Sequence, residues 1–171
     1  RKTFGEPFSA RKAYGQALVN LGETHPNVVV LSADVSNSDH SFMFEAVYPN
    51  RFFNVGIAEQ ALVDVSVGFA HSGKVAIANT FAFLFASRAL EMIRTHLCYG
   101  EANVKLAGAY GGLSDSFDGP THQSITDIAI MLVSLPDLMV TMVVGGGFSA
   151  AIVPALRKLP AADASRFFLQ L

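Results

Sequence analysis

A single carboxylate, Glu59, lies where a predicted strand gives way to a predicted helix, in the run Arg51-Phe-Phe-Asn-Val-Gly-Ile-Ala-Glu-Gln60. Phe52 to Val55 are expected to form a short buried strand, Gly56 breaks the pattern, and the apolar residues after Glu59 indicate a helix. Enzymes with α/β folds place their chemistry at such junctions. From its position alone, Glu59 could serve catalysis, or it could satisfy the free N–H groups and the dipole of the helix start.

A long loop, Tyr110 to Gln123, combines backbone-shaping glycine and proline with polar side chains. Loops of this length without regular structure are usually functional. His122 could exchange protons or bind a hydroxyl, although capping or solvation is the commoner fate of a histidine. Asp118, which precedes Gly119 and Pro120, could equally belong to a simple turn.

Aromatic residues alternate with smaller ones directly after another predicted strand, at Phe81, Phe83 and Phe85. A flat ligand could stack on one of these rings, or the rings could fill the core. Asp34 lies in a polar loop, Ser32 to Asp39, that follows a further strand. The loops that follow parallel strands open on one edge of a sheet, so Asp34, Glu59, Phe81, Asp118 and His122 could converge there.

The elements that position these residues alternate along the chain. Continuous β-branched runs indicate strands that are buried on both faces, as in a parallel sheet. Strands are predicted at Val28–Leu31, Phe52–Val55, Val75–Ala78, Val104–Ala109, Leu138–Val144 and Phe167–Leu171. Helices are predicted after the cap residue Ser9, at Ala58–His71, from Phe83 to Leu97, near Ile125–Leu132 and at Phe148–Leu159. We therefore expect an α/β fold with a doubly wound, mostly parallel six-stranded sheet and helices on both faces.

Composition limits the functions that this chain can have. Its 171 residues fit one domain, and 51% of them are hydrophobic. The net charge is −2 and no Lys/Arg cluster occurs, so neither nucleic acid nor an anionic membrane is an expected partner. The single cysteine, Cys98, excludes an internal disulfide and fits a reducing cytosol. No apolar run reaches the roughly 20 residues of a membrane span, and the prediction is a cytoplasmic protein. With so few charges, part of the surface is expected to be buried against a partner chain.

Three motifs together resemble the pyrimidine-binding domain of the transketolase family of thiamine-diphosphate enzymes. They are Asn54-Val-Gly-Ile-Ala-Glu-Gln60, Thr80-Phe-Ala-Phe-Leu-Phe-Ala-Ser-Arg-Ala89 and Asp118-Gly-Pro-Thr-His-Gln123. Their order and spacing also match, and the resemblance runs from about Phe8 to about Val143. It fades at Gly145-Gly-Gly147, where the family usually shows a Pro-Ala-Asp turn.

The resemblance implies that Glu59 is the catalytic acid that hydrogen-bonds N1′ of the cofactor's aminopyrimidine. This contact favours the imino tautomer, whose exocyclic nitrogen can take the proton from C2 of the thiazolium. Phe81 is then expected to stack on the pyrimidine. Leu84 occupies the family's second aromatic position and is flanked by Phe83 and Phe85, so Leu84 and Phe85 are also candidate cofactor contacts, and Asp34 matches an acidic residue near the cofactor.

The same resemblance implies that Asp118 and His122 contact sugar hydroxyls, with His122 as a second catalytic residue. Arg88 could contact a substrate phosphate or pair with Glu91 on its own helix. Two departures bear on the substrate: Tyr110 stands where transketolases that act on phosphorylated sugars often carry histidine, and Gly111 stands where deoxyxylulose-phosphate synthases place a phosphate-binding arginine.

The family's signature for the diphosphate and its metal ion, Gly-Asp-Gly with a downstream Asn, does not occur in this sequence. We therefore expect a single pyrimidine-binding domain over residues 1–171, without diphosphate-binding and C-terminal domains and without a metal ligand of its own. A partner subunit in an oligomer would complete the site for thiamine diphosphate and Mg²⁺. The predicted function is a split transketolase that transfers a two-carbon ketol unit between sugar or sugar-phosphate substrates. The alternatives are the β-subunit of a 2-oxoacid dehydrogenase and a non-catalytic assembly module with the same fold.

Overall fold

The computed structural model describes residues 9–115 and 117–125. The helices are α1 (Ala10–Thr24), α2 (Ser36–Asp39), α3 (Phe42–Val47), α4 (Glu59–His71), α5 (Ala82–Ala86) and α6 (Leu90–Met92). The strands are β1 (Val28–Ser32), β2 (Phe52–Asn54), β3 (Val75–Phe81) and β4 (Val104–Ala109). One-turn 3₁₀ helices lie at Pro49–Arg51 and Gly119–Thr121, and a π-helical segment lies at Ile93–Cys98.

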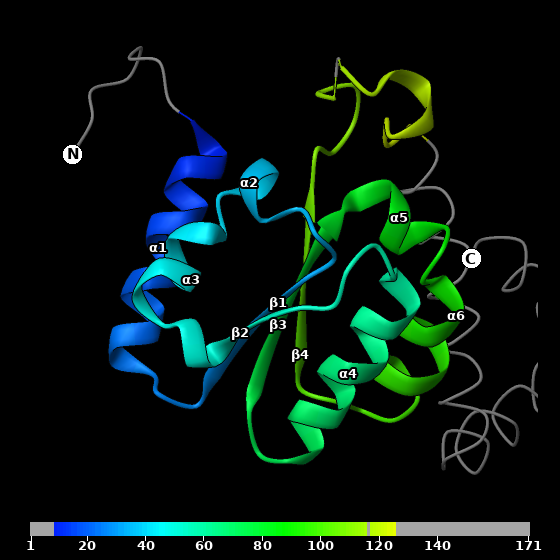
Figure 1. Ribbon diagram of the computed structural model, residues 1–171. Coiled ribbons are helices and arrows are strands. Elements are labelled where there is room, and N and C mark those ends of the chain that lie inside the picture. Colours follow the sequence, from blue (N-terminus) through cyan, green and yellow to red (C-terminus); the bar gives the residue numbers. More distant parts are fainter. Residues whose placement is uncertain (1–8, 116, 126–171) are drawn as a thin grey trace, which may run out of the picture. The chain divides into compact units, whose positions relative to one another are not determined.

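The strands form a parallel sheet in the order β2-β1-β3-β4 (Figure 1). Val30 is in register with Phe52 on one side and with Ile77 on the other. Every residue of β1 is buried, as its unbroken apolar sequence predicts for a central strand. The parallel α/β architecture is thus confirmed for these strands. The predicted strands at 138–144 and 167–171, the helix at 148–159, the glycines at 145–147 and nearly all of the helix near 125–132 lie outside the described residues.

Helices cover both faces of this sheet, as expected (Figure 1). On one face Val29 and Leu31 pack in a core cluster with residues of α4 and with the segment that follows β3, among them Leu62, Phe85 and Ile93. On the other face, Val28 and Val30 pack with Leu18 of α1 and Phe44 of α3, and with Phe52 and Ile77. The alternation of side chains along β1 therefore supplies both cores.

The helix predicted from Phe83 to Leu97 is interrupted. Ser87 donates its hydroxyl to the Phe83 carbonyl at 2.7 Å, and the Ala89 N–H reaches back five residues to the Leu84 carbonyl at 3.0 Å. Such back-bonding competes with regular helical hydrogen bonds, so α5 ends at Ala86 and α6 begins only at Leu90. The turn that results sets Arg88 apart from both helices.

Helix α1 starts at the cap residue that the sequence predicts, Ser9. The Lys12 N–H donates to Ser9 Oγ at 3.3 Å, and α1 begins at the next residue after the cap. After β1, by contrast, the segment expected to be a polar loop contains α2, and α3 follows it. No helix among the described residues is both long and apolar enough to cross a membrane.

Candidate functional site

Glu59 is the first residue of α4, and its side chain is only 1% exposed. Its Oε2 accepts a hydrogen bond from Arg88 Nη1 at 3.0 Å. Within the described residues this cation, and not the free N–H groups of the helix start, is its hydrogen-bond partner. The position therefore holds a buried carboxylate whose charge is compensated from the turn between α5 and α6.

Of the two contacts that the sequence allowed for Arg88, the pairing with Glu91 does not form. The interruption after α5 leaves Arg88 outside the helix that carries Glu91, and the guanidinium turns to the buried Glu59 instead. Glu91 accepts a hydrogen bond from the Thr95 hydroxyl at 3.2 Å. The Arg88 side chain remains 53% exposed, so one part of it faces solvent while Nη1 holds Glu59.

Phe81 and His122 lie against each other, as the convergence of loops at one sheet edge predicts. Their ring centroids are 5.3 Å apart, and the rings meet edge to face at 85°. The ring of Tyr110 lies 5.3 Å from that of Phe81 on the loop after β4. Of the neighbouring candidates, Leu84 is half-buried, whereas Phe85 is 3% exposed and belongs to the core cluster that includes α4.

Asp118 and His122 flank the short 3₁₀ helix Gly119–Thr121. The Thr121 hydroxyl donates to the Asp118 carbonyl at 2.9 Å, and Thr121 Oγ1 lies 2.9 Å from His122 Nδ1. Gly119 has φ +66°, a conformation that favours glycine. The turn expected as the simpler explanation of this motif is therefore present, and it sets the exposed Asp118 one turn before His122.

Asp34 is linked to the Glu59 loop through Asn54. Asn54 Nδ2 donates to Asp34 Oδ1 at 2.8 Å, while Asn54 Oδ1 accepts from the Asp34 N–H at 3.1 Å and from the Gly56 N–H at 2.9 Å. Asp34 holds φ +62°, so the reciprocal bonds support a conformation that is uncommon for this residue type. Asn54 heads the first motif, but its positioning role was not anticipated.

Two further residues at this edge, Arg11 and Tyr14, form hydrogen bonds that connect α1 to other elements. Arg11 donates to the Tyr110 hydroxyl and to the Ser38 carbonyl. The Tyr14 hydroxyl donates to Asn79 Oδ1, and burial, followed by the nearby Asp39, raises the pKa of Tyr14. Tyr14 fits the apolar periodicity of α1 as a core residue, and Arg11 fits it as a solvated one. Neither position carries a local signal that points to a site.

Comparison with known proteins decides the family. The model of the "Transketolase, pyrimidine binding domain" family matches residues 6–145. The chain belongs to this family. A putative transketolase C-terminal section of Methanocaldococcus jannaschii is 41% identical over 130 residues, which are 76% of this chain and 41% of that protein. Human transketolase is 38% identical over 127 residues, which are 74% of this chain and 20% of that enzyme.

Solved structures of transketolases have the same fold. A split-gene transketolase, described as an inactive β4 tetramer, superposes with a TM-score of 0.63 at 44% identity over 75% of this chain and 40% of its own. The transketolase of Leishmania mexicana superposes with a TM-score of 0.67 over 78% of this chain and 21% of its own, at 22% identity. The likeness at that identity concerns the fold alone. This transketolase pyrimidine domain thus spans well under half the length of these relatives.

The residues present suit the pyrimidine part of the cofactor that the family uses. A buried carboxyl group, Glu59, provides a polar contact for a ring nitrogen, and Phe81 provides an aromatic surface. No cluster of three or more His, Cys, Asp or Glu side chains that could hold a metal ion occurs within residues 9–115 and 117–125. In this transketolase domain, therefore, the described residues fit the heterocycle of that cofactor.

Proposed function

We propose that this chain is the pyrimidine-binding part of a thiamine-diphosphate-dependent transketolase, which transfers a two-carbon ketol unit between sugar-type substrates. The observation that carries the proposal is Glu59. It is 1% exposed, it opens α4, and it lies in the motif Asn54-Val-Gly-Ile-Ala-Glu-Gln60. A carboxyl group has a reason to be buried at this position if a ligand nitrogen completes its hydrogen bonds.

Thiamine diphosphate, when bound, supplies the nucleophilic carbon and the electron sink for ketol transfer. In this proposal Glu59 forms a hydrogen bond with N1′ of the pyrimidine, and Phe81 binds the ring by stacking. The half-buried Leu84 and Asp34 are further proposed cofactor contacts. Phe85 is also a candidate cofactor contact, but it belongs to the core cluster, which supports the assignment of the pyrimidine contacts to Phe81 and Leu84.

His122 and Asp118 are assigned to substrate hydroxyls. Nδ1 of His122 lies against the Thr121 hydroxyl, 2.9 Å away, which fixes the ring and leaves Nε2 for a proton exchange with substrate. The Phe81 ring also contacts the imidazole, edge to face. Arg88 has an exposed part besides its contact with Glu59, and this part is the candidate for an anionic substrate group.

In this proposal a partner subunit supplies the ligands for the diphosphate and Mg²⁺, since the Gly-Asp-Gly signature does not occur within residues 1–171. We therefore propose that residues 1–171 act as one pyrimidine-binding domain within an oligomer. The name of the Methanocaldococcus jannaschii relative, a transketolase C-terminal section, supports a divided enzyme. The cytoplasm is the proposed location.

Reconstitution tests this function. The chain alone should show no ketol transfer, and addition of a diphosphate-domain subunit, thiamine diphosphate and Mg²⁺ should restore turnover. Glu59→Gln should abolish turnover in the complex, whereas the matched variant Glu23→Gln, at an exposed position of α1, should keep it. Turnover that survives Glu59→Gln would overturn the assignment.

The same complex separates the alternatives. An oxidative decarboxylation assay with 2-oxoacids should show no activity, since that reaction belongs to the dehydrogenase alternative. Calorimetric titration with thiamine diphosphate should release or absorb heat that depends on Glu59. A non-catalytic assembly module would show no cofactor-dependent heat.

A further inference from the structure

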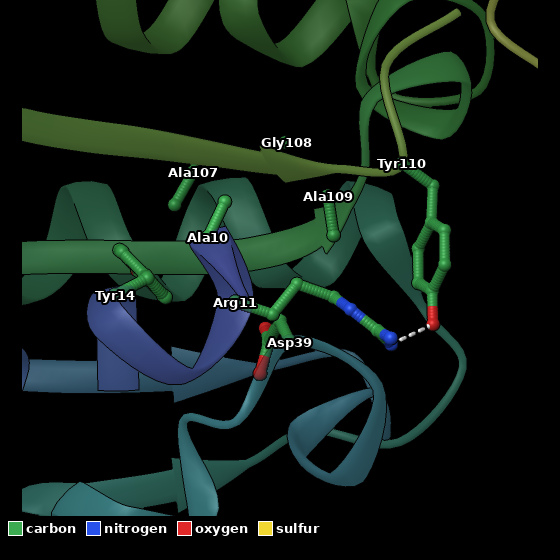
Figure 2. Close-up of a pocket in the computed structure, with 8 residues that line it drawn as sticks. All are labelled: Ala10, Arg11, Tyr14, Asp39, Ala107, Gly108, Ala109 and Tyr110. Carbon is green, nitrogen blue, oxygen red and sulfur yellow. Dashed lines mark hydrogen bonds between the residues drawn. The ribbon is translucent and has the colours of Figure 1, made fainter. Parts of the chain in front are cut away.

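The loop that follows β4 is tied down at both ends. It begins at Tyr110, whose hydroxyl accepts a hydrogen bond from Arg11 of α1, as Figure 2 shows. It ends at Ser124, whose N–H donates to the Gly112 carbonyl at 2.9 Å, and these two residues pair as an isolated antiparallel bridge. Both residues that the proposed function assigns to substrate hydroxyls lie inside this closed loop.

The interior of the loop holds an acid, while its surface holds apolar side chains. Asp115 is 3% exposed, whereas Leu113 is 68% and Phe117 is 100% exposed. Apolar side chains are ordinarily buried and acids are ordinarily exposed, so the reverse order is informative. A loop shaped by the hydrophobic effect alone would turn Leu113 inward. The conformation of this loop is therefore determined by the groups that Asp115 bonds.

Asp115 bonds both ends of the motif that begins at Asp118 and ends at Gln123. Its Oδ1 accepts from the Asp118 N–H at 3.3 Å, and its backbone carbonyl accepts from Gln123 Nε2 at 3.1 Å. The one-turn 3₁₀ helix Gly119–Thr121 lies between these two contacts, and His122 follows it directly. Asp115 thus spans the short helix from its first flanking residue to the residue after His122.

This acid is kept in the loop at a cost to stability. The Oδ2 atom of Asp115 is buried and has no hydrogen-bond partner among the described residues, and the same holds for Oγ of Ser124. A buried polar atom without a partner is unfavourable. An apolar side chain of similar size would avoid this cost, so stability does not explain the residue. Departures of this kind are expected at functional sites.

Contacts lead from Asp115 to the edge of the sheet. His122 meets Phe81, the last residue of β3, edge to face with 5.3 Å between the ring centroids. On the loop side, the His122 N–H donates to the Gly119 carbonyl at 3.1 Å. Gly119 directly follows Asp118, which Asp115 holds. A shift of the short helix would therefore move the imidazole relative to Phe81.

We propose that Asp115 is a positioning residue, which holds Asp118 and His122 in the arrangement that binds substrate hydroxyls. The inference rests on the proposed function for the role of those two residues, whereas the positioning is a property of the chain itself. Asp115 acts through the Asp118 N–H and the Gln123 side chain. Its loss should weaken the use of substrate and leave the affinity for thiamine diphosphate unchanged, because the cofactor contacts assigned to Glu59 lie outside this loop.

NMR of the isotope-labelled full chain tests the positioning. Asp115→Leu removes the acceptor and the unpartnered oxygen together, so the midpoint temperature Tm should stay nearly the same. The Asp118 amide should exchange with deuterium about tenfold faster, the factor that one ordinary hydrogen bond produces. The His122 ring protons sense the ring current of Phe81, and their shifts should move toward those in Phe81→Leu. Unchanged signals at both residues would overturn the proposal.

Conservative and control variants isolate the role of the acceptor. Asp115→Asn keeps an oxygen for the Asp118 N–H and should restore both signals, while Asp115→Ala, which adds no bulk, should behave like Asp115→Leu. Ser114→Ala removes another hydrogen bond of the same loop, from Oγ to the Gly111 carbonyl at 2.9 Å, and should leave the signals unchanged. Equal changes in Ser114→Ala would assign the effect to the loop in general and refute the role of Asp115.

The reconstituted complex distinguishes this inference from the proposed function. There, kcat/KM for a ketose should fall about tenfold in Asp115→Leu, mainly through KM, and should recover in Asp115→Asn. The dissociation constant of thiamine diphosphate should be the same in all variants. A complex that transfers no ketol unit, while Asp115→Leu still alters the Asp118 and His122 signals, refutes the proposed function and supports the positioning. Transfer that needs Glu59 but is unaltered in Asp115→Leu refutes the inference and supports the function.

Discussion

Arg88 holds Glu59 by a hydrogen bond of 3.0 Å between Nη1 and Oε2, although the two residues are 29 positions apart. The acid is almost fully buried, while the arginine is half exposed. The bond joins the start of α4 to the turn between α5 and α6. This bond gives the buried Glu59 a hydrogen-bond partner at the position where the proposed cofactor would bind.

This pair should show coupling in a double-mutant cycle. Arg88→Gln, Glu59→Gln and the double variant are compared with the unmodified chain by urea denaturation. Because Arg88 is 53% exposed, solvent screens the pair, and we expect a coupling free energy of about 0.5–1 kcal/mol. Strict additivity of the two single changes would show that the bond adds nothing to stability.

Asp39 should make stability depend on pH. Burial raises the pKa of Asp39, with the Ser41 hydrogen bonds opposing the shift, and Tyr14 and His40 are nearby titratable groups. The protonated form is therefore favoured in the folded state. The contribution of this acid is fully present below its unfolded pKa of about 3.9 and is lost as pH rises through the higher folded pKa.

Asp39→Asn mimics the protonated acid at all pH values. Its midpoint temperature Tm should exceed that of the unmodified chain by about 2–5 °C at pH 7. The difference should shrink as pH falls through about 4 and disappear below about pH 3, where both the folded and the unfolded state of the unmodified acid are protonated. Circular dichroism melts across this pH range check the expectation, and a difference that stays constant with pH contradicts it.

Tyr14→Phe should destabilise the fold because the hydroxyl is the donor to buried Asn79 Oδ1. The aromatic ring stays, so the loss comes from an acceptor left without a partner, and it should amount to about 1–2 kcal/mol. Tyr99→Phe is the matched control, because Tyr99 is 67% exposed, and should change the free energy of unfolding by less than about 0.5 kcal/mol. Equal effects of the two changes in chemical denaturation would disprove the role of the Tyr14 hydroxyl.

Gly22 and Gly68 should respond oppositely to alanine. A Cβ at Gly22 would lie 2.5 Å from Cε2 of Tyr48 and 2.7 Å from Cε2 of Phe44, so α1 would have to move away from α3 at a cost of about 1–3 kcal/mol. A Cβ at Gly68 meets no atom within 4 Å, and alanine there should stabilise α4 by about 0.5–1 kcal/mol. Thermal melts of both variants decide this, and a neutral Gly22→Ala would show that the helices repack freely.

Features that are encoded locally were predictable from the sequence. The unbroken apolar run of β1 predicted a strand buried on both faces, and Ser9 predicted the start of α1. The position of Glu59 at a junction of strand and helix was predictable because a strand, a glycine and an apolar helix follow one another there. The edge-to-face contact of Phe81 with His122 agrees with the convergence that a parallel sheet imposes on loops.

Features that depend on distant partners were not predictable. The sequence allowed Arg88 to contact a substrate phosphate or to pair with Glu91 on its own helix, but the interruption at Ser87 and the buried Glu59 determine its place. Arg11 and Tyr110 are 99 positions apart, and only the fold brings them together. The buried Oδ2 of Asp39, which has no hydrogen-bond partner among the described residues, likewise depends on how α2 packs, because the sequence around it predicts only a polar loop.

The Asn79 amide connects α1 to the middle of the sheet. Its Nδ2 donates to the Leu31 carbonyl at 2.8 Å and to the Ile77 carbonyl at 3.2 Å, while its oxygen accepts from Tyr14. Both amide protons are thus bonded to strand carbonyls, so we expect them to exchange slowly with deuterium. A shift of α1 that moves the Tyr14 hydroxyl would change the surroundings of this one side chain, so its NMR signals provide a spectroscopic reporter of how α1 lies on the sheet.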